Sequence, residues 1–193
     1  PPSIEGIKVM SMAYIWPENK CVMVEDADAM DDVLHLLLPG IIDWGELDYL
    51  VVDTPPTSTG VVKVALEANG VYGAVIVTHA STVSKMDTTR TIDLFAEKEV
   101  PIIGVVCNQS IDENGSPRYD LLPSDIERMA SEYVIPYLAT IPHIRDSGKL
   151  NPYFDIIAEA VMSGKRATLK VKPIEEEAWK KLLQLAKRLR GSA

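Results

Sequence analysis

The sequence predicts an α/β fold in which a mostly parallel central sheet is flanked by helices. Four apolar segments rich in β-branched residues alternate along the chain with helical segments. The apolar segments show little polar–apolar alternation, which is typical of strands covered on both faces. Strands separated by helices favour parallel neighbours joined by right-handed crossovers. We therefore expect one α/β domain over residues 1–193, a length that is sufficient to bury a core.

Each of the four predicted strands is followed by polar residues. They cover residues 47–53, 72–78, 101–107 and 134–141. A fifth segment, residues 7–12, alternates more regularly and is expected at an edge of the sheet.

Five helices are predicted between and after these strands. Three of them cover residues 83–96, 124–132 and 151–161. Another helix, residues 26–38, begins with acidic residues and stops before Pro39-Gly40, and a C-terminal helix at residues 173–190 has an acidic first turn and a basic last turn. The run Ser124-Asp125-Ile126-Glu127 predicts a capping box. Residues 109–122 form the longest expected loop.

Charge and cysteine content restrict the class of protein. The net charge is −9 and the pI is about 4.8, so neither nucleic acid nor an anionic membrane is an expected partner. The two cysteines form no CxxC pair, which fits a cytoplasmic protein better than a disulfide scaffold. The apolar runs are too short to span a bilayer.

Candidate site residues follow the predicted strands, because ligands of open α/β sheets bind beyond the carboxyl ends of the strands. Asp53 ends one strand, and a carboxylate there can hold hydrated Mg²⁺ beside a nucleotide triphosphate. Asn108 ends another and can pair with a purine ring, and Pro142 follows the next. Each residue alone is better explained as part of a turn or a strand end. His79 also follows a strand, so pocket lining stays open for it, while Cys107 is interpreted as a buried strand residue.

Taken together, these motifs resemble the Mrp-type branch of the MinD/ParA superfamily of deviant P-loop ATPases. The resemblance runs from about residue 6 to residue 149. Its most specific block is DWGELDYLVVDTPP at residues 43–56, and it continues through residues 73–78, Asp87, Arg90, Phe95, Asn108, Ser110 and residues 146–149.

The resemblance implies a nucleotide-binding domain with ATP and Mg²⁺ as cofactors. It implies that Asp53 is the catalytic aspartate that supports Mg²⁺, and that Thr54 and Pro55 begin the switch II loop. Asn108 would contact adenine, and Pro142 would flank the base. The family's link to iron–sulfur cluster assembly or delivery implies apo-protein clients, and its members pair as dimers. A homodimer, or a heterodimer with a related ATPase, is therefore expected.

The sequence also departs from that family. No glycine-rich Walker A loop with its lysine occurs in residues 1–193, so the N-terminal P-loop unit is absent. We expect the domain to be incomplete at its N-terminus, with ATP hydrolysis only if a P-loop lies upstream. Thr57 and Gly60 replace switch II residues, and acidic residues stand near positions 25–26 where relatives carry an arginine. The family's CxxC is missing, which argues against a cluster bound to this chain.

Three functions are compatible with these patterns. The first is an Mrp-like ATP-binding protein with a role in iron–sulfur cluster assembly or delivery. The alternative is a non-catalytic homologue that acts as an interaction module or as the partner subunit of an intact ATPase. A ParA-like positioning ATPase is the least favoured, because the chain is acidic.

Overall fold

A three-stranded parallel sheet forms the centre of the part of the chain that the structure describes. The computed structural model describes residues 2–4, 6–11, 42–54 and 71–167. The sheet has the order β3-β4-β5, with β3 at Ala74–Thr78, β4 at Ile102–Asp112 and β5 at Tyr137–His143. Both pairs of neighbours run parallel. The predicted α/β class and parallel sheet are therefore confirmed.

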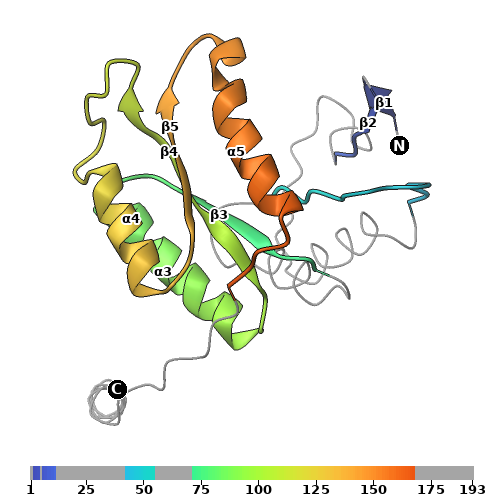
Figure 1. Cartoon of the computed structure of the whole chain (residues 1–193), viewed down its shortest axis with the longest axis horizontal. Coiled ribbons are helices and arrows are strands. Elements are labelled where there is room, and N and C mark those ends of the chain that lie inside the picture. Colours follow the sequence, from blue (N-terminus) through green and yellow to red (C-terminus); the bar gives the residue numbers. More distant parts are fainter. Residues whose placement is uncertain (1, 5, 12–41, 55–70, 168–193) are drawn as a thin grey trace, which may run out of the picture.

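Helices cover both faces of this sheet, as Figure 1 shows. On one face lie α3 (Thr82–Glu97) and α4 (Pro123–Glu132). On the other face lies α5 (Asn151–Met162), which follows the short 3-10 helix η2 (Ser147–Leu150). These three helices match the predicted helices at residues 83–96, 124–132 and 151–161 to within two residues.

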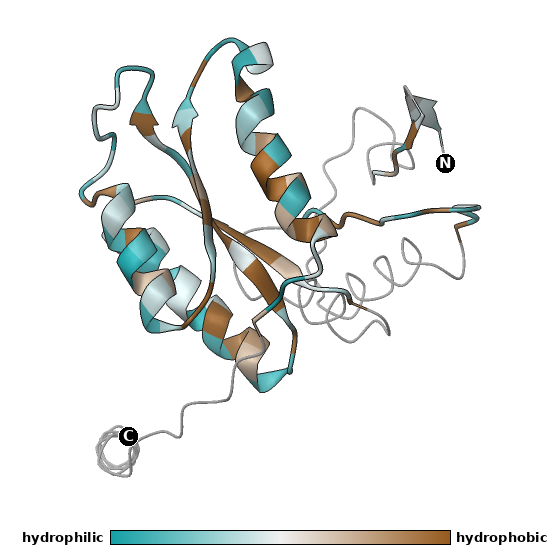
Figure 2. Cartoon of the chain, viewed as in Figure 1, coloured by the Kyte–Doolittle hydropathy of each residue, from teal (hydrophilic) through white to brown (hydrophobic). Residues whose placement is uncertain are grey.

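The larger hydrophobic core lies between the sheet and the pair α3 and α4. It contains fully buried side chains from every one of these elements, among them Ile92, Val105, Ile126 and Met129. A smaller cluster under α5 joins Val106, Ala139 and Ile141 to Leu150, Tyr153 and Ile157. Burial of one such aliphatic side chain stabilises the fold by about 1.5–3 kcal/mol. Figure 2 shows the apolar residues concentrated in the strands, while the helices alternate between apolar and polar residues.

The central strand, β4, is buried along residues 102–107. Its Gly104 allows β5 to approach closely, because a Cβ atom there would lie 2.5 Å from Leu138 Cγ and 2.8 Å from the Pro136 carbonyl oxygen. β4 is also longer than predicted. It continues for five residues beyond Cys107 into the segment expected to be a loop, and Ile111 forms an antiparallel bridge with Pro117.

The start of α4 differs from the predicted capping box. The helix begins at Pro123, one residue before Ser124. The side chain that reaches back is Asp125, whose Oδ2 accepts a hydrogen bond from the Leu122 backbone N–H at 2.9 Å. Proline fits the first helical position because its missing N–H would have no partner there, and this moves the start of the helix.

One strand prediction is wrong and another is confirmed only in part. Residues 47–53 form no strand, and their side chains are exposed, with Val51 at 88%. A strand needs a hydrogen-bonded neighbour, and within the described residues the parallel sheet ends at β3. Of the edge strand predicted at 7–12, only β2 (Ile7–Lys8) is a strand, and it pairs antiparallel with β1 (Ser3–Ile4) in a separate two-stranded sheet.

β3 has the composition of an interior strand. It is the outermost strand of the described parallel sheet, and its sequence AVIVT contains no charged residue. Edge strands usually carry charged residues or proline, which prevent pairing with a strand of another molecule. The side chain of Val77 is nevertheless 61% exposed.

Some predictions fall on parts of the chain that the structure does not describe. The helices at 26–38 and 173–190, together with Thr57, Gly60 and the acidic residues 25–26, lie outside the described residues. Within the described ranges, no helix is long and apolar enough to cross a membrane.

Candidate functional site

The carboxyl ends of the three parallel strands bring polar residues to one rim of the sheet. Thr78 of β3 pairs with Cys107 of β4, and Asn108 pairs with Ile141 of β5. His79, Asn108 and Pro142 therefore stand in a row across the rim. Crevices at this end of parallel sheets are where ligands bind in open α/β folds.

Of the five predicted site residues, two lie at this rim. Asn108 is half-buried, and its side-chain amide has no hydrogen-bond partner among the described residues. Pro142 is buried within β5. Asp53 and Thr54 are exposed, outside the described sheet, so Asp53 does not end a strand beside Asn108 as expected. Pro55 lies outside the described residues.

A further rim residue, His79, was only weakly indicated by the sequence, and its neighbour Tyr119 was not indicated at all. His79 Nδ1 lies 2.7 Å from the carbonyl oxygen of Asn108. The His79 and Tyr119 rings lie with their centroids 5.0 Å apart and their planes at 30°. Because His79 follows a predicted strand, a role in lining a binding pocket was left open for it. Tyr119 lies in a predicted loop, and no sequence pattern tells which ring such a loop packs against.

Ser110 connects the two strand ends at the rim. Its fully buried Oγ accepts hydrogen bonds from the Ala80 backbone N–H at 2.7 Å and from Cys107 Sγ at 3.1 Å. It lies 3.2 Å from the Asn108 carbonyl oxygen, to which it donates. Gln109, between Asn108 and Ser110, has the left-handed φ of 51°, and the β4–β5 register shifts at this point. This bulge turns Ser110 back toward β3.

Asp120 holds the loop after β4 against the start of α3. Its carboxylate accepts hydrogen bonds from the Thr82 hydroxyl at 2.5 Å and from the Thr82 backbone N–H at 3.2 Å. The Thr82 hydroxyl, followed by its backbone N–H, lowers the pKa of Asp120 below its ordinary value. A carboxylate at a helix N-terminus also interacts favourably with the helix dipole.

We expect Asp120→Asn to lower the melting temperature at pH 7, and the deficit to shrink in acid. A folded-state pKa below the unfolded value means that the carboxylate stabilises the fold above the unfolded pKa, and that this contribution is lost as pH falls through the folded pKa. Thermal unfolding of both proteins between pH 7 and pH 3 measures the deficit. Asp155→Asn, at an exposed α5 carboxylate without a hydrogen bond among the described residues, is the matched control. An equal deficit for Asp155→Asn would contradict the assignment.

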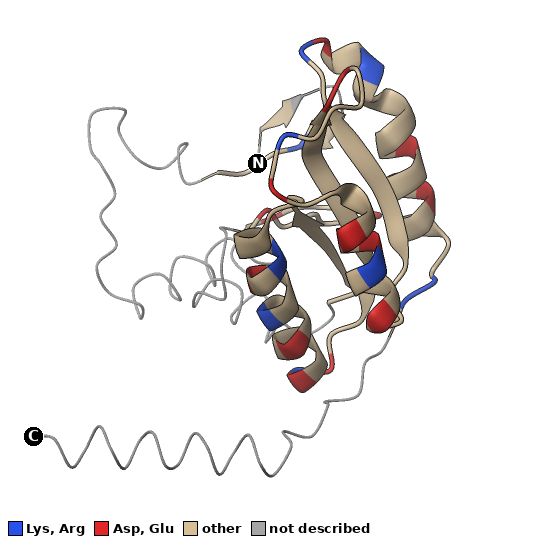
Figure 3. Ribbon diagram, turned by 90° about the vertical axis from the view of Figure 1, so that its left-hand side faces the viewer, with Lys and Arg blue, Asp and Glu red and all other residues tan. Residues whose placement is uncertain are grey.

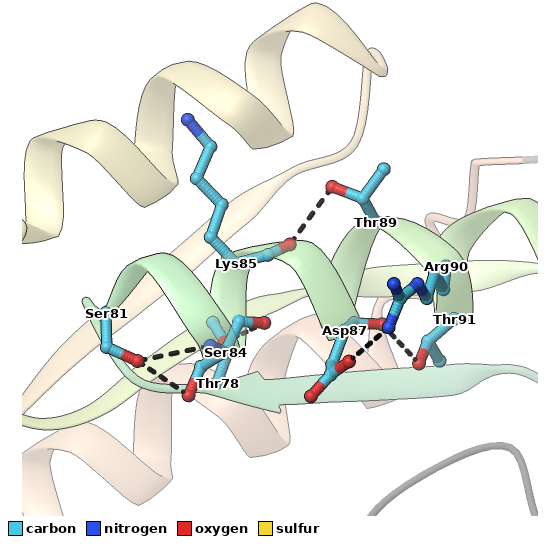
Figure 4. Close-up of polar contacts among 8 residues, drawn as sticks. All are labelled: Thr78, Ser81, Ser84, Lys85, Asp87, Thr89, Arg90 and Thr91. Atoms are coloured by element: carbon cyan, nitrogen blue, oxygen red, sulfur yellow. Dashed lines mark hydrogen bonds and ion pairs between the residues drawn. The ribbon is translucent and has the colours of Figure 1, made fainter.

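Hydroxyl groups join the start of α3 to the end of β3, and Figure 4 draws those of Thr78, Ser81 and Ser84. Ser81 caps the helix and accepts from the Ser84 backbone N–H at 3.1 Å. The Thr88 hydroxyl donates to the Thr78 hydroxyl at 2.7 Å, and both residues are buried. On the exposed side, Arg90 and Asp87 form an ion pair at 3.0 Å. The hydroxyl contacts fix α3 against β3.

Metal-ligating side chains do not form a cluster among the described residues. Among them, no group of three or more His, Cys, Asp or Glu side chains is placed to hold an ion. Cys107 is fully buried, and this burial raises the pKa of its thiol, which disfavours the thiolate that binds iron. The charged side chains instead lie mostly on the outer surfaces of the helices and in the loops, as Figure 3 shows.

Comparison with known proteins places these features in a family. The family model described as ParA, NUBPL iron-transfer P-loop NTPase, matches residues 1–171. An iron-sulfur cluster carrier protein of Methanocaldococcus jannaschii is 30% identical over 149 residues, which cover 72% of this chain and 49% of that protein. A protein of the same name from Deinococcus radiodurans is 34% identical over 145 residues, covering 74% of this chain and 40% of its own.

A mouse protein is similar over a shorter stretch. The iron-sulfur cluster transfer protein NUBPL of Mus musculus is 36% identical over 107 residues, which cover 55% of this chain and 33% of the mouse protein. The chain thus spans half or less of the length of these curated relatives.

Proposed function

The chain belongs to the ParA family of NUBPL-type iron-transfer P-loop NTPases, and we propose that it serves in the assembly or delivery of iron–sulfur clusters as a nucleotide-binding component. The observation that carries this proposal is the family match over residues 1–171. The parallel sheet supports it, because β4 carries Asn108 to the carboxyl rim at which this fold binds ligands.

The nucleotide is ATP, and its base lies at the rim beside Asn108. An uncommitted amide offers both a donor and an acceptor, which fit an adenine edge. Asp53 is the proposed support for Mg²⁺, with Thr54 and Pro55 beginning the loop that senses the γ-phosphate. Residues 1–193 contain no Walker A pattern. Binding of the triphosphate needs such a loop in addition, and we propose a related partner subunit or a longer form of this polypeptide as its source.

The iron–sulfur cluster is cargo rather than a resident cofactor. We assign its ligands to a partner or to a dimer rather than to the described part of this chain. This follows from the lack of a metal-binding group among the described residues and from the buried Cys107. The partner is a second copy or a related ATPase, and the clients are apo forms of iron–sulfur proteins.

Depletion of the protein in its own cells tests the proposed role. We expect the activities of iron–sulfur enzymes to fall while the activities of enzymes without clusters stay constant. A copy encoding Asn108→Ala should restore those activities less well than the parental copy, because it lacks the amide that receives the base. Unchanged iron–sulfur enzyme activities after depletion would overturn the role in cluster assembly. Full rescue by Asn108→Ala would remove Asn108 from the nucleotide site.

A further inference from the structure

Two aromatic rings stand beside Asn108 at the rim, and the proposed function uses neither. His79 extends the end of β3, and Tyr119 comes from the segment between β4 and α4. Their rings are stacked with a 5.0 Å separation of centroids and a tilt of 30°. His79 is half-buried and Tyr119 is 37% exposed, so part of the stacked pair faces solvent.

The position of the Tyr119 ring is fixed by hydrogen bonds of the residues that precede and follow it in the sequence. Before it, the Arg118 backbone N–H donates to the Ser110 carbonyl oxygen at 3.0 Å. After it, Asp120 accepts from Thr82, and the Leu121 backbone N–H donates to the Ala80 carbonyl oxygen at 3.0 Å. A ring fixed by its neighbours loses little conformational freedom when a ligand binds, so it is preorganised for contact.

The hydrogen bond of His79 fixes the orientation of its ring. The Asn108 carbonyl oxygen can only accept, so Nδ1 carries the hydrogen and donates to it across 2.7 Å. The rim therefore combines two ring faces held in fixed orientations with the side-chain amide of Asn108.

We infer that the His79–Tyr119 ring pair is the surface on which the base of the bound nucleotide stacks. This inference rests on the proposed nucleotide site and assigns the residues that hold its base. Stacking on aromatic rings suits any base, so it contributes affinity, and the choice of base is left to the side-chain amide of Asn108.

Titration with AMP and with ribose 5-phosphate, followed by NMR of the labelled 193-residue chain, tests the inference. Ribose 5-phosphate is the probe that lacks only the base. We expect AMP to shift the Tyr119 and His79 ring signals, with no such shift from ribose 5-phosphate. Tyr119→Ala should weaken AMP binding about tenfold, and Tyr119→Phe should leave it near the parental value. His79→Phe should also keep AMP binding, because it retains an aromatic ring at this position.

The control is Tyr72→Ala, which removes a tyrosine of similar exposure, 41%, before the opposite end of β3. It should bind AMP like the parent. If AMP shifts Asn108 but Tyr119→Ala binds AMP as tightly as the parent, the stacking surface is overturned while the nucleotide site stands. Shifts of the same ring signals by ribose 5-phosphate would overturn it as well, because that ligand has no base to stack. If neither AMP nor ATP shifts any rim signal, the proposed nucleotide site fails together with this inference.

Discussion

Gly104→Val should lower the free energy of unfolding by about 3 kcal/mol, the upper range for an overpacked core. A Cβ atom at Gly104 would lie 2.5 Å from Leu138 Cγ and 2.8 Å from the Pro136 carbonyl oxygen. Leu138 is a side chain that could turn aside, but the carbonyl belongs to the backbone that leads into β5. Relief of the clash therefore requires β5 to move away from β4 and to weaken their pairing.

Chemical denaturation gives the change in unfolding free energy, and thermal unfolding should show a melting temperature lower by about 6–12 °C for a chain of this length. Gly148→Ala is the matched control, because its added Cβ would meet only Asp146 Oδ1 at 3.4 Å, an ordinary contact, and its φ is not left-handed. It should change stability by less than about 0.5 kcal/mol. A melting temperature for Gly104→Val equal to that of the control would show that β5 does not depend on this close approach.

The core of the sheet was predictable from the sequence because burial leaves a continuous apolar pattern. Residues 102–107 are apolar except for Gly104, and every one of them is buried in β4. The same pattern misled at residues 47–53, where the apolar run forms no strand. An apolar composition indicates that a segment could form a buried strand. Whether it does depends on a neighbouring strand with which it can pair, and the sequence of the segment itself does not specify that neighbour.

The residues at the rim of the sheet were predicted only in part, for a different reason. Asn108 was found because it follows an apolar run, and His79 was noted because it follows another. Their contacts with the loop after β4 were not predictable, because Tyr119 with His79 and Asp120 with Thr82 are residues about 40 positions apart. The loop that makes these contacts is shaped by the bulge at Gln109, whose left-handed backbone is unusual for a residue with a side chain and has no sequence signature.

Ser110→Ala should lower the free energy of unfolding by about 2 kcal/mol, since one missing hydroxyl leaves a buried donor unsatisfied. The Ala80 backbone N–H donates to Ser110 Oγ at 2.7 Å, and both residues are fully buried. Water does not readily replace the lost acceptor there. The same hydroxyl donates to the Asn108 carbonyl oxygen, so its loss should also loosen the strand ends that carry His79 and Asn108. Denaturation measures the first effect, and amide hydrogen exchange at Ala80 measures the second.

Ser131→Ala separates this network from the general effect of losing a serine hydroxyl. Ser131 Oγ donates to the Glu127 carbonyl oxygen at 3.0 Å on the exposed side of α4, where water can take its place. Alanine also favours the helix, so the control should stay within about 0.5 kcal/mol of the parent. Faster exchange at Ala80 in Ser110→Ala, but not in Ser131→Ala, would locate the loss at the rim. Equal stability of the two variants would instead mean that the ends of β3 and β4 stay paired without Ser110. The positions of His79 and Asn108 would then be set by the strands alone.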